Sequence, residues 1–208
     1  MYHLAINFHY VGMPKFPFPA IHGLSAGELY KTLKLLKQRF KFVSQHEILE
    51  RINNQTFLKD LKKEECMITF DDGLKCQYEA ALPVLKSLNI PAIFFINCKP
   101  YIDGSALLVH KMHWIRANLG EKKLCEKLES FLKEMNLPYH PNSVAFNVAQ
   151  SIYQYDSPTT AQLKYFLNFV LPEAYVDTIA ESLLSELAMK ESEFIHLYYM
   201  NTQMIQEI

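Results

Sequence analysis

Short apolar runs and helically spaced apolar stripes alternate along the first hundred residues. Continuous runs predict strands at residues 3–9, 40–43, 66–70 and 92–96. Apolar residues three or four positions apart predict helices at residues 26–39, through Ile48, Leu49 and Ile52, and from Tyr78 to Leu88. Ser25 and Ser44 precede the first two helices, where a hydroxyl can accept a bond from the first backbone amides.

The run Cys66–Phe70 lacks the polar alternation of a half-exposed strand, so we expect a strand of a parallel sheet that is covered on both faces. Pro83 interrupts the following apolar stripe and should kink the helix or break its first turn. Strand, helix and strand together span about thirty residues, the length of a right-handed βαβ crossover.

The second half of the chain has a different pattern. Amphipathic stripes predict helices at residues 105–119, 121–135, 159–170 and 173–189, with no strand of comparable strength between Asn97 and Phe194. We interpret this block as a helical insertion. The tail HLYYMNTQMIQEI predicts a brief extended segment and then a short helix capped by Asn201 or Thr202.

The charged residues give no support for some classes of partner, and their distribution changes along the chain. The chain has 208 residues and a formal net charge of −1, which gives no argument for binding nucleic acid or an anionic membrane. Residues 1–100 carry 13 basic and 9 acidic side chains, whereas residues 101–208 carry 8 and 13, so the composition changes near residue 100. The four cysteines form no CxxC pair and are expected to be reduced thiols.

The first residues, MYHLAINFHY, contain no basic leader followed by a long apolar stretch. No window reaches the uninterrupted apolar length of a membrane span. The expectation is therefore a cytoplasmic protein.

The candidate chemistry lies in the segment ITFDDG. Asp71 and Asp72 follow the apolar strand, at the end where functional groups gather in parallel α/β proteins. Neighbouring side chains point in different directions, so one carboxylate could bind a metal while the other faces the water that the metal activates. Gly73 would allow a sharp turn. The alternative interpretation is that Asp-Gly is only turn chemistry.

Two groups of histidines are further candidates. His9 ends the first strand at the same rim as Asp71, as a pocket residue or as a histidine hydrogen-bonded at a strand end. His110 and His113 lie three apart on a predicted helix and could share a metal. The alternative for this pair is a polar or half-buried helix face beside Trp114.

ITFDDG, Tyr78, ALPVLK, NIPAIFFI and the opening NFHYV together resemble the polysaccharide deacetylase family, also called the NodB-homology or carbohydrate esterase 4 group. The resemblance covers roughly residues 1–100. It implies an α/β fold, an incomplete distorted β/α barrel, that hydrolyses N-acetyl or O-acetyl groups on sugars. It also implies that Asp71 is the general base and Asp72 a ligand of a divalent metal, commonly zinc. His9, Tyr10 and Gly73 would line the substrate pocket.

The chain departs from the family in one motif, the pattern His-Ser/Thr-x-x-His-Pro/Ser that supplies two further metal ligands. None of the eight histidines fits it: His3, His9, His22, His46, His110, His113, His140 and His196. The tail is similar to the helix that precedes this motif. The implied division is an amino-terminal barrel part at 1–100, a helical insertion at 101–195 and a truncated return to the barrel at 196–208.

Two functions of different class follow from these observations. The first is a metal-dependent deacetylase acting on an acetylated glycan or amino-sugar precursor. The second is a non-catalytic fragment or pseudoenzyme that binds glycan or a partner chain. In the second case, the uncovered strand edges of a half barrel would favour a homodimer or pairing with a separately encoded second half. A magnesium-dependent phosphotransferase is disfavoured, because no Gly-rich phosphate loop is present.

Overall fold

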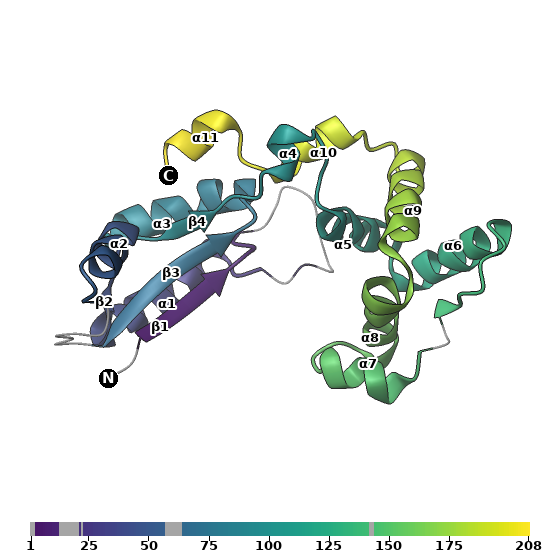
Figure 1. The fold of residues 1–208 in the computed structure, drawn as a ribbon, viewed down its shortest axis with the longest axis horizontal. Helices are drawn as coiled ribbons and strands as arrows, with labels where there is room; N and C mark the ends of the chain where they lie inside the picture. Colours follow the sequence, from purple (N-terminus) through teal and green to yellow (C-terminus); the bar gives the residue numbers. More distant parts are fainter. Residues whose placement is uncertain (1–2, 13–20, 22, 57–63, 142–143) are drawn as a thin grey trace. The chain divides into compact units, whose positions relative to one another are not determined.

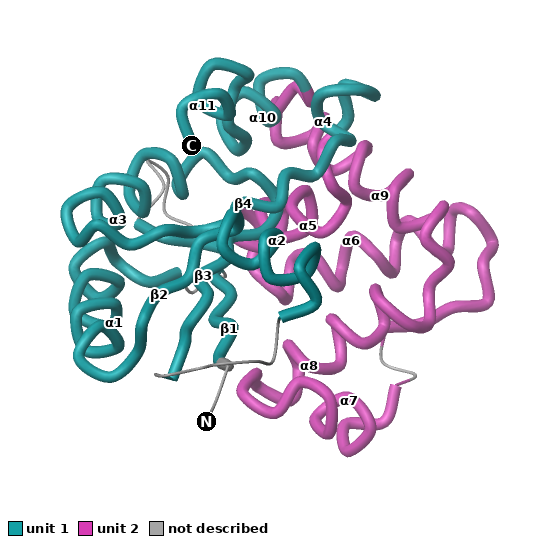
Figure 2. The backbone as a smooth tube through the Cα atoms, turned by 60° about the vertical axis from the view of Figure 1, so that its left-hand side comes forward, with its two compact units in different colours: residues 1–17, 21–105, 192–208 teal, residues 18–20, 106–191 magenta. Residues whose placement is uncertain are grey.

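The chain folds into two compact units, coloured separately in Figure 2. The computed structural model describes residues 3–12, 21, 23–56, 64–141 and 144–208. Unit 1 comprises the described residues as far as Ser105 together with residues 192–208, and unit 2 comprises the described residues of the stretch 106–191. A parallel sheet with helices makes the fold α/β, as the sequence predicted.

Unit 1 holds the sheet and the helices that pack on it (Figure 1). Its elements in chain order are β1 (His3–Phe8), α1 (Ala26–Arg39), β2 (Lys41–Phe42), α2 (Gln45–Asn53), β3 (Glu65–Asp71), the π-helical turn η1 (Gln77–Ala81), α3 (Leu82–Leu88), β4 (Ile93–Phe95), α4 (Lys99–Ile102), α10 (Glu191–Tyr198, all but its first residue) and α11 (Thr202–Gln206).

Strand β3 is the centre of the four-stranded sheet, and all its pairings are parallel. β1 pairs with it from His3↔Glu65 to Phe8↔Phe70. β1 lies along one side of β3, and β2 and β4 both pair with the other side. β2 pairs with the start of β3, and β4 pairs with its end. The carboxyl ends of β1, β3 and β4 therefore meet at one edge of the sheet.

One face of the sheet packs against α1 and α3. Cys66, Ile68 and Phe70 of β3 point into this core, where they join the fully buried Leu29 and Leu33 of α1. The opposite face of β3 is covered less completely, because Met67 and Asp71 are partly exposed. The prediction of a strand covered on both faces is therefore confirmed fully for one face and partly for the other, where Glu65 and Thr69 are buried.

The predicted helix starts of unit 1 are confirmed. Ser25 and Ser44 each accept a bond from the backbone amide three residues ahead and complete a capping box. Pro83 lies in the first turn of α3, and the turn before it is π-helical, so the expected irregularity is present. Asn89 ends α3 with a φ of 50°.

Unit 2 is built from helices among its described residues. They are α5 (Leu108–Leu119), α6 (Glu121–Glu134), α7 (Phe146–Ile152), α8 (Pro158–Tyr165), the π-helical turn η3 (Phe166–Val170) and α9 (Glu173–Glu186). Apolar residues at every fourth position explain their packing: Leu124, Leu128 and Leu132 of α6 are all buried. The four helices predicted in this stretch are confirmed, with η3 completing the one expected at 159–170.

Three helices were not predicted, namely α4, α7 and α10. The prediction of an extended segment at the start of the tail is wrong for residues 196–198, because these residues belong to α10. Phe194 and Tyr198 lie one turn apart on this helix, are buried, and stack with ring centroids 4.5 Å apart. Tyr199, the residue after α10, makes a strand-like bridge to Leu74. The short final helix is confirmed, with Asn201 as its cap.

The cysteines and the lengths of the helices were also predicted from the sequence. All four cysteines are free. Across the described ranges, no helix combines the length and the apolar character needed to cross a bilayer.

Candidate active site

The two carboxylates lie where β3 ends. Asp71 is the last residue of β3, and Asp72 follows it with a φ of 76°. β1 ends beside them, because Phe8 pairs with Phe70, and His9 comes next along the chain. Parallel pairing thus brings Asp71, Asp72 and His9 to one edge of the sheet, as expected for functional groups in parallel α/β proteins.

Asp71 is oriented by a neighbour on β1. Asn7 donates from Nδ2 to Asp71 Oδ2 at 2.7 Å, and Thr69 Oγ1 donates to Asn7 Oδ1 at 3.0 Å. Asn7 and Thr69 are register partners, and Asp71 lies two residues further on the same face. The sequence interpretation missed Asn7. The available signal was one polar residue inside each of two mostly apolar runs, Asn7 in HLAINF and Thr69 in ECMITFD.

His9 contacts both carboxylates. Its Nδ1 lies 3.3 Å from Asp72 Oδ2, and its Nε2 lies 3.9 Å from Asp71 Oδ2 and 3.4 Å from Asn7 Nδ2. A carboxylate can only accept and the Asn7 amide nitrogen can only donate, so the neutral imidazole fits with its proton on Nδ1. The side chain is half exposed, which leaves its ring accessible from solvent.

Gln77 connects the two strand ends. This side chain is fully buried, and its Nε2 donates to the backbone carbonyls of His9, at 2.8 Å, and of Asp71, at 2.6 Å. Its Oε1 is buried without a hydrogen-bond partner among the described residues. Gln77 was not a sequence candidate, because nothing in its local pattern separates it from an ordinary helix residue. It fixes the spacing of the backbone that carries the carboxylates.

Gly73 closes the turn in a conformation that favours glycine. Its φ is 66°, and a Cβ at this position would lie 3.1 Å from Ile96 Cδ1 and 3.3 Å from Ile96 Cγ2. The backbone carbonyl of Gly73 accepts a bond from the Met200 amide at 2.9 Å, which holds the turn to the segment after α10. The predicted role of Gly73 in the turn therefore has a steric basis, while its role in a substrate pocket stays a prediction.

The Tyr10 side chain packs against buried aromatic residues. Its ring meets Tyr198 edge-on with centroids 6.4 Å apart. Burial, and then the neighbouring Tyr198, raises the pKa of the Tyr10 hydroxyl far above its ordinary value, so the group stays neutral. The contact of Tyr10 with substrate stays a prediction.

The described residues do not by themselves fit a catalytic metal site. No group of three or more His, Cys, Asp or Glu among them has a metal-binding arrangement, whereas a catalytic zinc ion usually has three protein ligands. Asp72 and His9 lie at hydrogen-bonding distance from each other instead. His110 and His113 do lie close on α5, with ring centroids 6.4 Å apart, but His110 is buried and this pair supplies no third ligand either.

Comparison with known proteins identifies one segment. Residues 58–136 match the family model described as polysaccharide deacetylase. The match includes ITFDDG, begins later than the resemblance expected at residues 1–100, and continues into α6. No curated protein matches the chain.

Several solved structures are similar over part of the chain. A de-N-acetylase from Aggregatibacter actinomycetemcomitans is 26% identical over 44% of this chain and 36% of its own, with a TM-score of 0.36. IcaB from Ammonifex degensii is 28% identical over 45% and 37%, with a TM-score of 0.37. The Streptococcus pyogenes deacetylase PplD, in complex with acetate, is 18% identical over 86% and 79%, with a TM-score of 0.40.

The aligned part of the chain spans little more than a third of the length of the first two of these structures. The assignment therefore rests on the matched segment that contains both carboxylates. Over residues 58–136, the chain matches the polysaccharide deacetylase family model.

Proposed function

We propose that this chain supplies the carboxylate part of a carbohydrate deacetylase centre, which removes acetyl groups from amino sugars of a glycan or its precursor. Asp71 is the general base and Asp72 a ligand of a divalent metal, with His9, Tyr10 and Gly73 lining the pocket. The observation that carries the proposal is the cluster of Asp71, Asp72 and His9 at the carboxyl edge of the sheet, with both aspartates inside the family segment.

The geometry of Asp71 suits a base. An acetamide is a poor electrophile, so its hydrolysis benefits from a group that takes a proton from the attacking water. Asn7 holds Asp71 through Oδ2, and Oδ1 is the oxygen to which the proposal assigns the proton. Because Thr69 in turn holds Asn7, the carboxylate is oriented by two successive hydrogen bonds.

The metal requires ligands beyond the described set. Asp72 is the proposed ligand, and His9 is the neighbouring residue able to join it. A second copy of this chain or a separately encoded protein is the proposed source of the remaining ligands. In the same proposal, unit 1 forms part of a distorted β/α barrel, residues 101–195 form an insertion in it, and the protein works in the cytoplasm.

The experiment measures acetate released from an N-acetylated chito-oligosaccharide in the presence of zinc. The chain is assayed alone and together with the polypeptide encoded directly downstream. Asp71→Asn should lower kcat by about 10²–10⁴-fold, the usual contribution of a general base. Asp72→Asn should abolish zinc binding measured by calorimetry. Asp103→Asn, an exposed change in the same unit, should leave both unchanged.

Failure of every combination to bind zinc or release acetate would overturn the proposal. The second candidate is a non-catalytic protein that binds glycan or a partner chain, and it is favoured by the lack of a three-ligand group among the described residues. It predicts saturable oligosaccharide binding that Asp71→Asn does not change, without acetate release.

A further inference from the structure

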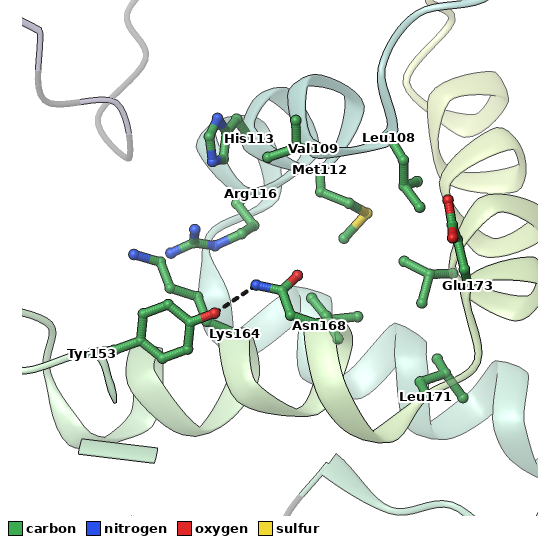
Figure 3. A pocket seen from close by; sticks show the side chains of 12 residues that line it. Leu108, Val109, Met112, His113, Arg116, Tyr153, Lys164, Asn168, Leu171 and Glu173 are labelled. Atoms are coloured by element: carbon green, nitrogen blue, oxygen red, sulfur yellow. Dashed lines mark hydrogen bonds between the residues drawn. The ribbon is translucent and has the colours of Figure 1, made fainter. Parts of the chain in front are cut away.

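Unit 2 contains a cavity of about 390 Å³ whose lining includes His113 but none of Asp71, Asp72, His9, Tyr10 and Gly73 (Figure 3). Its walls come from α5, α8, η3 and α9, together with Tyr153 at the end of α7. Pockets that bind small molecules have volumes of roughly 300–1,000 Å³. The cavity is therefore large enough for a small ligand.

One end of the cavity is apolar. Leu108 and Met112 of α5 line it, together with Leu171 and Val176 near the start of α9. Figure 3 shows Met112 and Leu108 extending into the space from one side and Leu171 lying across from them. This end would receive an aliphatic or aromatic body.

The other end is polar. Asn168 donates from Nδ2 to the hydroxyl of Tyr153 at 2.6 Å, and Lys164 Nζ lies 5.4 Å from the centroid of the Tyr153 ring. Figure 3 shows the guanidinium of Arg116 and the ammonium of Lys164 on the side of the cavity where this pair lies. Because the Tyr153 oxygen accepts from Asn168, its own hydrogen can be donated to a ligand.

The charges of this end favour an anion. Arg116 is 6% exposed, bonds Glu121 at 3.2 Å, and has an Nε without a hydrogen-bond partner among the described residues. Lys164 pairs with Asp156 at 2.5 Å. Both counter-ions stand outside the lining, whereas the one lining carboxylate, Glu173, lies toward the apolar end in Figure 3.

We propose that this cavity binds a small amphipathic carboxylate, whose apolar body fills the space between α5 and α9 and whose head is bound by Arg116 and Lys164. The planar guanidinium matches the two oxygens of a carboxylate. Glu173 disfavours a second negative charge at the other end of the ligand. The inference is independent of the proposed function, since every residue that carries it belongs to unit 2.

Octanoate is the probe, titrated into the full chain by calorimetry, with octanol and octylamine as neutral and cationic analogues of the same length. Saturable binding of one octanoate per chain is expected, at least tenfold tighter than either analogue. Shortening the probe to propionate should weaken binding, because the apolar end is left empty.

Asn168→Asp provides the decisive variant, because Asn168 is exposed and the change introduces a negative charge beside the head group without altering side-chain size. Octanoate affinity should fall at least tenfold and octylamine should become the better ligand. Lys164→Gln should also weaken octanoate. Asn147→Asp, an exposed change outside the cavity, should have no effect. Absence of saturable octanoate binding, equal binding of octylamine, or full affinity in both cavity variants would overturn the inference.

Discussion

Asp72 and Gly73 are consecutive residues with positive φ angles, 76° and 66°. An L-residue in this region is strained by contact between its Cβ and the backbone. Asp72 tolerates the conformation as aspartate residues sometimes do, but Gly73 has the additional constraint of Ile96 beside it. The turn that presents the carboxylates therefore depends on a glycine at position 73.

Gly73→Ala should destabilise the protein by about 1–3 kcal/mol, the cost of a non-glycine residue held in a sparsely populated conformation. The free energy of unfolding in urea measures this. Gly27→Ala is the matched control, because Gly27 lies in α1 and a Cβ there meets nothing within 4 Å; it should be neutral or stabilising. Equal effects of the two substitutions would contradict the steric argument.

Among single residues, the sequence predicted the two aspartates and the histidine of the candidate site but not the residues that hold them in place. Asp71 and Asp72 stand in a recognisable motif, and His9 stands at a strand end. Asn7 and Gln77 are defined by hydrogen bonds to residues distant in sequence. Those bonds depend on strand register and on the path of the chain after the turn, which one sequence does not determine.

The helices show which local signals were sufficient. Ser25 and Ser44 begin α1 and α2 as predicted, since a capping box needs only residues three apart. Helices α4, α7 and α10 have four to eight residues and were missed, because so short a stretch offers few turns in which an apolar period can be read.

The hydrogen bonds of Glu47 at the start of α2 should make the stability of the protein depend on pH. The bond from Lys41, and then those from Ser44, lower the pKa of Glu47 to about 2. A carboxylate with a lowered folded-state pKa stabilises the protein above its ordinary pKa of 4.5 and loses this contribution as pH falls toward 2. The difference in unfolding free energy between wild type and Glu47→Gln should therefore shrink between pH 5 and pH 2.

Urea titrations at several pH values measure this difference. Glu50→Gln is the control on the same helix; its exposed pair with His46 at 3.8 Å should contribute no more than about 0.5 kcal/mol. A Glu47→Gln difference that stayed constant with pH would contradict the capping argument.

For the whole molecule, the pattern and charge of the sequence change near residue 100, and unit 1 contains the described residues as far as Ser105. The insertion of residues 101–195 in a barrel remains a proposal. Each unit has its own buried residues: Leu29, Ile68 and Phe70 in unit 1, and Ile115 and Leu128 in unit 2. Two separate cores predict two unfolding transitions.

Lys111 offers a substitution confined to unit 2. Its side chain is fully buried and its Nζ lies 2.8 Å from Glu191 Oε1 and 3.6 Å from Asp177 Oδ1. Lys111→Ala should destabilise by about 3 kcal/mol, the low end for a broken buried pair, because both carboxylates are partly exposed.

Scanning calorimetry of the full chain should show Lys111→Ala lowering the midpoint of one transition and Gly73→Ala lowering the other. Lys122→Ala, an exposed change on α6, should shift neither. A single transition lowered by both variants would show that the chain unfolds as one cooperative body.

Gln77 begins a π-helical turn, in which the chain carries one residue more than an α-helix would need. Deletion of one residue after Gln77 in this turn would restore regular α-helical winding. The Gln77 side chain would then be rotated by about 100° around the helix axis. Its side-chain amide would then lose its hydrogen bonds to the backbone carbonyls of His9 and Asp71. Length, as much as chemical identity, is therefore under constraint in this turn, and a relative with a one-residue deletion there would need another way to keep its acidic pair in place.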